Sequence, residues 1–157
     1  MDIKTIPKLD LHCHLDGSLT KAMMERHLGK TIPEDALTVS EDCTSLTEYL
    51  EKFDLPVQCL QDEAGLEDGA YTFVEEIAKE HVEYIEVRFA PMLSVHENLS
   101  CAKVIESVRK GMERAKADFQ VQYGIIVCAM RNHSQEQNLS MLKCAREYLG
   151  YGGCALD

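Results

Sequence analysis

The chain has 157 residues, of which 45% are hydrophobic and 27% are charged, so it has enough apolar material for the core of one globular domain. Its formal net charge of -11 argues against binding to nucleic acid or to an anionic membrane surface, since both select basic patches. A small neutral substrate is easier to accommodate.

The N-terminal stretch MDIKTIPKLD mixes charges with a proline where a signal peptide needs an apolar core, and no later run has the length of a membrane span. The seven cysteines include no C-x-x-C pair and lie inside apolar periodic segments. We therefore expect a soluble cytoplasmic protein whose cysteines are reduced thiols of the core.

The segment LDLHCHLD, residues 9–16, alternates between apolar and polar side chains, which is the period of a β-strand. Its apolar set is Leu9, Leu11, Cys13 and Leu15. Its polar set is Asp10, His12, His14 and Asp16. Gly17 follows at the point where the chain has to turn sharply. The predicted strand thus has one apolar face and one face that is able to hold a cation.

The connection from Gly17 to Glu83 is far longer than the about two to six residues usual in α/β loops. SLTEYLEKF, residues 45–53, predicts a helical lid segment over a site at the end of the first strand. LEDGAYTFVEEIAKEHV, residues 66–82, predicts an ordinary helix against the sheet. The residues expected on its sheet-facing side are Ala70, Phe73, Val74, Ile77 and Ala78.

Two further complete strands are predicted after this insert. YIEVRFAP, residues 84–91, alternates again and carries Glu86 and Arg88 on one face. VQYGIIVCAM, residues 121–130, is β-branched and apolar on both faces, which is typical of a buried parallel strand.

Capping residues mark the helices between these strands. Ser100 caps a helix whose apolar positions recur every three or four residues up to Phe119. Ser134 with Gln137 forms a capping box for the next helix, which Gly150 is placed to end. The segment GGCALD then begins a fourth strand.

Strands that alternate with helices without hairpin signals indicate a parallel sheet, either an open doubly wound sheet or a (β/α)8 barrel. The polar sets on the first two strands favour the barrel, because there they face a shared interior instead of helices. A complete barrel needs about 250 residues. We therefore expect residues 1–157 to form the N-terminal half of a single TIM-type barrel domain, with a helical lid insertion at about 17–62. Its exposed edge then has to be covered by the missing C-terminal half or by a second copy.

His12 and His14 form an H-x-H pair at the C-terminal end of the first predicted strand. Two such side chains on one face are about 7 Å apart at the backbone, and both reach a single ion at roughly 2.0 to 2.1 Å per Zn–N bond. The alternative is a half-exposed strand whose imidazoles are satisfied by hydrogen bonds. The position at a strand end, before the turn at Asp16 and Gly17, favours the metal site.

The segments LDLHCHLDGSL, YIEVRFAP and CAMR, in this order, resemble the N-terminal half of the adenosine deaminase family of zinc-dependent amidohydrolases. The resemblance implies zinc as the cofactor, with His12 and His14 as two of its ligands, and a purine nucleoside as the bound molecule. It also implies that Asp16 and Gly17 contact the nucleoside, the aspartate towards a ribose hydroxyl. The substrate-binding residues implied in this way are His14, Asp16, Gly17, Leu46, Tyr49, Phe53 and Met130.

The reaction that the resemblance implies is attack of a zinc-activated water on C6 of adenosine or 2'-deoxyadenosine, which expels ammonia and gives the inosine product. In the family a third histidine, an aspartate ligand, a glutamate acid and a further histidine follow strands five to eight. The resemblance therefore implies no catalytic residue within this chain and no activity of the 157 residues alone. Arg88 looks like the family's strand-two arginine, for which a structural role beside Glu86 competes with a catalytic one.

Three alternatives stay open. An adenine or AMP deaminase of the same family would share the first strand, although Asp16 favours adenosine over adenine. A phosphoesterase-type metal barrel also begins with DLHCH, but it usually continues with threonine and lacks YIEVRFAP. The third alternative is a non-catalytic half-barrel fragment whose edge pairs with another chain.

Overall fold

The computed structural model describes residues 3–157, which form one parallel sheet with helices packed on it. The strands pair in chain order, β1-β2-β3-β4, and every pair is parallel. Their bounds are β1 Lys8–His14, β2 Val82–Phe89, β3 Gln122–Val127 and β4 Gly153–Leu156. The predicted α/β architecture with four parallel strands is confirmed.

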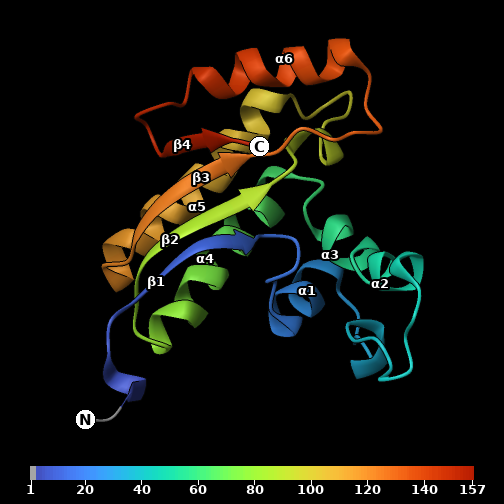
Figure 1. Cartoon of the computed structure of the whole chain (residues 1–157), viewed down its shortest axis with the longest axis vertical. Coiled ribbons are helices and arrows are strands. Elements are labelled where there is room, and N and C mark those ends of the chain that lie inside the picture. The colour runs from blue at the N-terminus through green and yellow to red at the C-terminus, as the bar shows by residue number, and fades with distance from the viewer. Residues whose placement is uncertain (1–2) are drawn as a thin grey trace.

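Long helices connect successive strands. Their bounds are α4 Glu63–Lys79, α5 Cys101–Phe119 and α6 Gln135–Arg146. In Figure 1, α4 and α5 lie behind the sheet and α6 lies beyond β4, so the helices leave the opposite face of the sheet uncovered. Short 3-10 helices span Ile3–Thr5, Glu34–Ala36 and Pro91–Leu93.

Serine caps start α5 and α6 as predicted. The Ser100 hydroxyl accepts from the Lys103 N–H, and Ser134 and Gln137 form both bonds of a capping box. The prediction that Gly150 ends the last helix is wrong, because α6 already ends at Arg146. Gly150, with φ of 82°, lies instead in the turn that leads into β4, where a left-handed conformation favours glycine.

The insert between β1 and β2 contains three helices before α4 begins: α1 Lys21–Leu28, α2 Leu46–Glu51 and α3 Asp54–Cys59. The helical segment expected over residues 45–53 forms α2, and the chain then turns at Lys52 and Phe53 and continues as α3. The insert has a small core of its own. Its buried members are Met23, Met24, Ile32 and Cys59.

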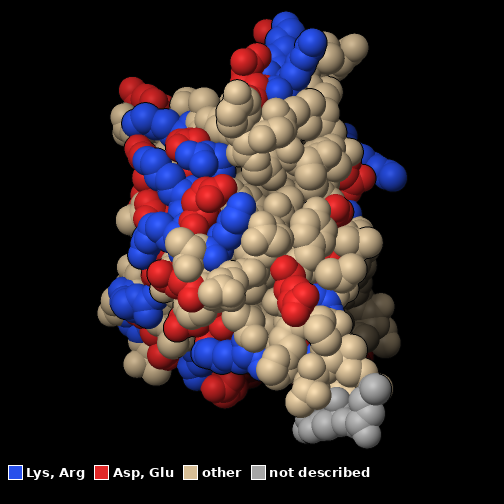
Figure 2. All heavy atoms as spheres, turned by 90° about the vertical axis from the view of Figure 1, so that its left-hand side faces the viewer, with Lys and Arg blue, Asp and Glu red and all other residues tan. Residues whose placement is uncertain are grey.

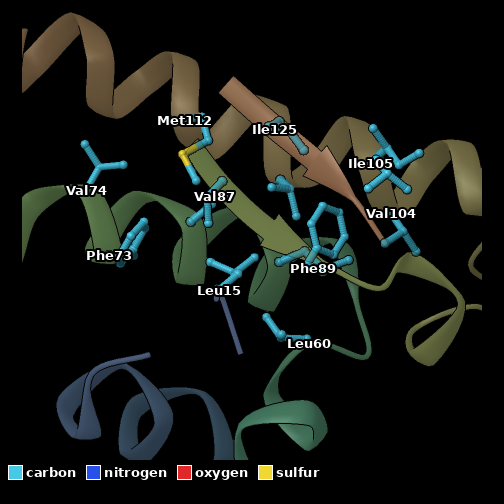
Figure 3. Packing of buried hydrophobic residues seen from close by; sticks show 14 of the residues in the cluster. Leu15, Leu60, Phe73, Val74, Val87, Phe89, Val104, Ile105, Met112 and Ile125 are labelled. Atoms are coloured by element: carbon cyan, nitrogen blue, oxygen red, sulfur yellow. The ribbon is translucent and has the colours of Figure 1, made fainter. Parts of the chain in front are cut away.

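The main core lies between the sheet and the α4/α5 layer (Figure 3). Val87 and Phe89 of β2 and Ile125 of β3 point into this layer, where Phe73 of α4 and Met112 of α5 meet them. Of the residues expected on the sheet-facing side of the helix over 66–82, three are buried and two are half-buried. The buried ones are Ala70, Phe73 and Val74, and the half-buried ones are Ile77 and Ala78.

Helices α4 and α5 approach closely at Gly111, where a Cβ atom would lie 2.2 Å from the carbonyl oxygen of Glu67. Replacing glycine by alanine inside a helix normally stabilises it by about 1 kcal/mol. Here we expect the opposite sign, because the contact is with backbone. Gly111→Ala should lower the free energy of unfolding by roughly 1 to 3 kcal/mol in urea denaturation.

The control for this substitution is Lys110→Ala at the neighbouring exposed position, which should change stability by less than about 0.5 kcal/mol. A Gly111→Ala protein that is as stable as the parent would contradict the close helix contact.

The cysteines of the described chain form no disulfide. Cys59 and Cys128 are buried, as expected for core thiols, but Cys154 is exposed. The prediction is wrong for Cys154 because it lies on β4, an edge strand of the sheet. Of the helices between residues 3 and 157, none combines the length and apolar character that crossing a bilayer requires.

The edge strands β1 and β4 leave apolar side chains in solvent. Leu9 and Leu11 of β1 are 69% and 57% exposed, and Leu156 of β4 is 42% exposed. Figure 2 shows charged side chains crowded on one side of the molecule and a broad uncharged band beside them. On this face of the molecule a charged region and an uncharged region thus lie side by side.

Candidate functional site

A cavity of about 920 Å³ opens at the carboxyl ends of β1, β2 and β3. His14, Asp16 and Gly17 at the end of β1 form one wall, and the segments that follow β2 and β3 form another. Because the strands are parallel, the residues that leave them converge at this one edge. The insert covers the remaining side with residues of α2 and α3.

His12 and His14 project together from the end of β1. Their ring centroids are 5.5 Å apart and the rings are tilted by 48°. The pairing of β1 with β2 is irregular between Asp10 and Cys13, and the His12 N–H donates to the Asp10 carboxylate at 3.0 Å. Such irregularities often lie beside active sites, where they re-aim a side chain.

His14, unlike His12, lines the cavity. Burial lowers the pKa of His14, and the charges of Arg88 and His12 lower it further, while Asp16, 3.8 Å away, acts against this change. The neutral imidazole, which is the form that binds a metal, is therefore favoured.

Asp16 lies in the cavity wall with only 20% of its side chain exposed. Burial raises the pKa of this carboxyl, and the neighbouring His14 opposes the shift. Its Oδ1 atom accepts from the Gly17 N–H at 3.1 Å, which fixes the side chain at the start of the turn. The Asp16 carboxylate is thus a fixed acceptor group in the cavity wall.

Arg88 of β2 holds the inner face of the sheet together. Its guanidinium lies 3.0 Å from Nε2 of His12 on β1 and forms an ion pair with Asp157 beyond β4. Its neighbour on the strand, Glu86, accepts from the Tyr84 hydroxyl at 3.0 Å. His12 and Arg88, which were expected on one face of the sheet, are thus in contact.

The lid wall of the cavity is built by an aromatic pair. The rings of Tyr49 and Phe53 are 5.5 Å apart and nearly edge to face. A Cβ atom at Gly17 would lie 3.2 Å from Phe53, so glycine permits this close approach between lid and turn. Met130, which follows β3, lines the cavity as well.

One residue expected in the lid wall is not there. Leu46 is 72% exposed and is absent from the cavity lining, because it lies at the first position of α2, one turn before Leu50. The structure brings Leu50, Val57 and Leu93 to the cavity instead. The spacing of four residues from Phe53 to Val57 is the sequence signal that would have found Val57.

The described residues offer two candidate ligands for a metal ion. Two imidazoles from one strand end are suitable nitrogen ligands for zinc, but a catalytic zinc usually takes three protein ligands. Between residues 3 and 157, no three His, Cys, Asp or Glu side chains lie close enough to hold an ion. His12 and His14 therefore fit zinc as one half of a ligand set.

Comparison with known sequences gives a consistent match. A family model described as adenosine deaminase matches residues 7–157. The adenosine deaminase of Vibrio atlanticus is 39% identical to the chain and that of Clostridium perfringens is 34% identical, each over 100% of this chain and 50% of the relative. The chain thus spans about half the length of the curated relatives that it matches.

Solved structures show the same relation. An ADAL–IMP complex superposes with a TM-score of 0.80 at 24% identity, over 99% of this chain and 50% of the other. An Arabidopsis N6-mAMP deaminase gives 0.78 at 25% identity, over 99% and 50%. A zinc-bound amidohydrolase from Burkholderia ambifaria gives 0.78 at 18% identity, over 98% and 44%. The predicted fold, half of a TIM-type barrel, is confirmed.

Proposed function

The chain belongs to the adenosine deaminase family, and from this premise we propose that the complete protein hydrolyses adenosine and 2'-deoxyadenosine to the corresponding inosine and ammonia. The observation that carries the proposal is the joint position of His12, His14 and Asp16 at the end of β1, beside a cavity large enough for a nucleoside.

Within this proposal, His12 and His14 hold zinc together with ligands from outside the described residues. When bound, zinc supplies a water nucleophile activated at neutral pH. His14 binds through a neutral ring, in agreement with its lowered pKa. The family resemblance assigns the proton donor to the second half of the barrel, so this chain contributes binding and orientation.

The cavity walls suit a purine nucleoside. The apolar surface available to a flat base comes from Tyr49, Phe53, Leu93 and Met130. The base is uncharged and needs no counter-ion. Asp16 accepts a hydrogen bond from the 5'-hydroxyl of the ribose, beside Gly17. This arrangement holds C6 of the base towards the two histidines.

The walls suit a nucleoside better than a nucleotide. Among the described residues that line the cavity, Arg88 is the sole lysine or arginine, and it is already ion-paired with Asp157. Asp16 and Asp54 place two carboxylates in the same walls, where they would repel a 5'-phosphate. AMP is therefore the weaker candidate, although a structural relative is described as an N6-mAMP deaminase.

The test measures kcat/KM of the complete zinc-loaded protein for adenosine, for AMP and for adenine. The reaction is monitored by the absorbance change on loss of the amino group. We expect adenosine to be the best substrate. A higher value for AMP or for adenine would assign the protein to another branch of the family, and no deamination of any of the three would reject the activity.

Asp16→Ala should lower kcat/KM for adenosine by roughly 10- to 150-fold, because a hydrogen bond to a charged group contributes about 1.5 to 3 kcal/mol. The same substitution should have almost no effect on 5'-deoxyadenosine, which lacks the proposed donor. An equal loss of kcat/KM with both substrates, measured by the same absorbance change, would show that Asp16 does not act through the 5'-hydroxyl.

The family match favours deamination over the phosphoesterase alternative. We also propose a cytoplasmic location, since free thiols without disulfides in the described chain are typical of a reducing compartment. The partner that covers the open edge of the sheet is proposed to be the second half of the barrel.

A further inference from the structure

A second cavity adjoins the first one, on the side of the insert. Its volume is about 400 Å³. Four residues line both cavities, namely Asp16, Gly17, Tyr49 and Phe53. The two cavities therefore share one wall, and the base and ribose proposed for the first cavity do not account for the second.

The remaining walls of the second cavity are mostly apolar and come from the insert between β1 and β2. The apolar members are Leu19, Met24, Leu37, Val39 and Pro56. Thr38 and Lys52 complete these walls, and both have protein partners. The Thr38 hydroxyl donates to the Glu34 carbonyl at 3.2 Å, and Lys52 Nζ donates to the Asp35 carbonyl at 2.8 Å. Such walls favour an uncharged apolar occupant.

Asp16 relates the second cavity to the nucleoside. The proposed function, on which this inference rests, places the 5'-hydroxyl of the ribose on the Asp16 carboxylate. Because Asp16 belongs to the shared wall, the C5' atom that carries this hydroxyl lies next to the boundary between the cavities. The wall is thin beside Asp16, since Gly17 has no side chain and a Cβ atom there would lie 3.2 Å from Cε1 of Phe53. A substituent on C5' that points past Asp16 therefore enters the second cavity.

We propose that the second cavity is a subsite for an uncharged apolar substituent on C5' of the nucleoside, so that the complete protein also deaminates 5'-alkylthio-5'-deoxyadenosines. The reaction at C6 is unchanged: water replaces the amino group and ammonia leaves. A thioether gives up the hydrogen bond to Asp16, and burial of its alkyl chain in the second cavity offsets this loss. A 5'-phosphate is disfavoured in the same place, because the Asp16 carboxylate lies in the shared wall.

The experiment compares two nucleosides that both lack the 5'-hydroxyl, so that the hydrogen bond to Asp16 contributes nothing to the difference. With the complete protein, kcat/KM for 5'-propylthio-5'-deoxyadenosine should exceed that for 5'-deoxyadenosine by at least roughly tenfold, because the propyl group is buried against apolar walls. An equal or lower value for the propylthio compound would overturn the inference. If adenosine is still deaminated in that case, the proposed function stands and only the second subsite is rejected.

Filling the second cavity tests where the propyl group lies. Val39 lines the second cavity and not the first, so Val39→Trp should bring the ratio of the two kcat/KM values down to about one. The ratio is taken within each variant, so a general loss of activity cancels. Glu41→Trp places the same side chain two positions further on, outside both cavities, and should keep the parent ratio. Thr38→Trp, at an exposed position of the same wall, serves if Val39→Trp does not fold.

Calorimetry with the deaminated compounds gives a readout that does not depend on turnover. The complete protein should bind 5'-propylthio-5'-deoxyinosine at least roughly tenfold more tightly than 5'-deoxyinosine, and Val39→Trp should remove this difference. Equal dissociation constants for the two compounds, or a preference that persists in the folded Val39→Trp and Thr38→Trp variants, would overturn the inference. This measurement decides on the second cavity even if the protein deaminates no nucleoside, a result that would reject the proposed function separately.

Discussion

A complete protein that carries both His12→Ala and His14→Ala is expected to hold almost no zinc, whereas the parent is expected to hold about one ion per chain. The two imidazoles project from one strand end with ring centroids 5.5 Å apart, so their removal takes away a whole side of the coordination sphere. Adenosine deamination should fall by at least roughly a thousandfold, because the metal supplies several kcal/mol of transition-state stabilisation.

Metal analysis after dialysis measures the occupancy directly. The matched control is His81→Asn, which removes a histidine from the turn before β2, where φ is 59° and asparagine is tolerated. This variant should keep its zinc and its activity. Full zinc occupancy in the double alanine variant would show that the ion is held elsewhere.

Expressed without any further sequence, the 157-residue chain is expected to be inactive and not to remain a monomer. The edge strands β1 and β4 offer backbone groups to other chains, and Leu9 and Leu11 are 69% and 57% exposed beside the first of these edges. Sedimentation should show self-association or aggregation, and added adenosine should stay unchanged until a complementary half-barrel is supplied.

A charged edge provides the control for this prediction. Leu9→Lys with Leu11→Lys should reduce self-association, because lysine on an edge strand opposes pairing with another chain. A compact and active monomer of the unsubstituted chain would contradict both the assignment of the fold and the location of the catalytic groups.

Local features of the fold were predictable from the sequence because they depend on neighbouring residues. Ser100 and Ser134 identify their helices through bonds to backbone groups three positions away. The alternation of residues 9–16 identifies a strand, and the same pattern places His12 and His14 on one face. These features need no knowledge of how distant segments pack.

Features that depend on packing were not predictable in this way. Leu46 and Leu50 are equally apolar in sequence, but only docking of α2 decides that Leu50 lines the cavity and Leu46 faces solvent. The ion pair of Arg88 with Asp157 depends on the register of β2, β3 and β4 together. A pattern within one segment carries no information about such a register.

The order of the strands has a consequence for synthesis on the ribosome. Since the strands pair in chain order, β3 and β4 each emerge when the strand that they pair with has already been made. β1 is the exception: it ends at residue 14 and has no partner until β2, which begins at residue 82, is synthesised. That interval takes roughly 3 to 14 s at 5–20 residues per second. During it, the small core of Met23, Met24, Ile32 and Cys59 is complete before β2 appears, and it compacts the chain beside β1. The insert then shortens the loop that the first strand pairing has to close, which lowers its entropic cost.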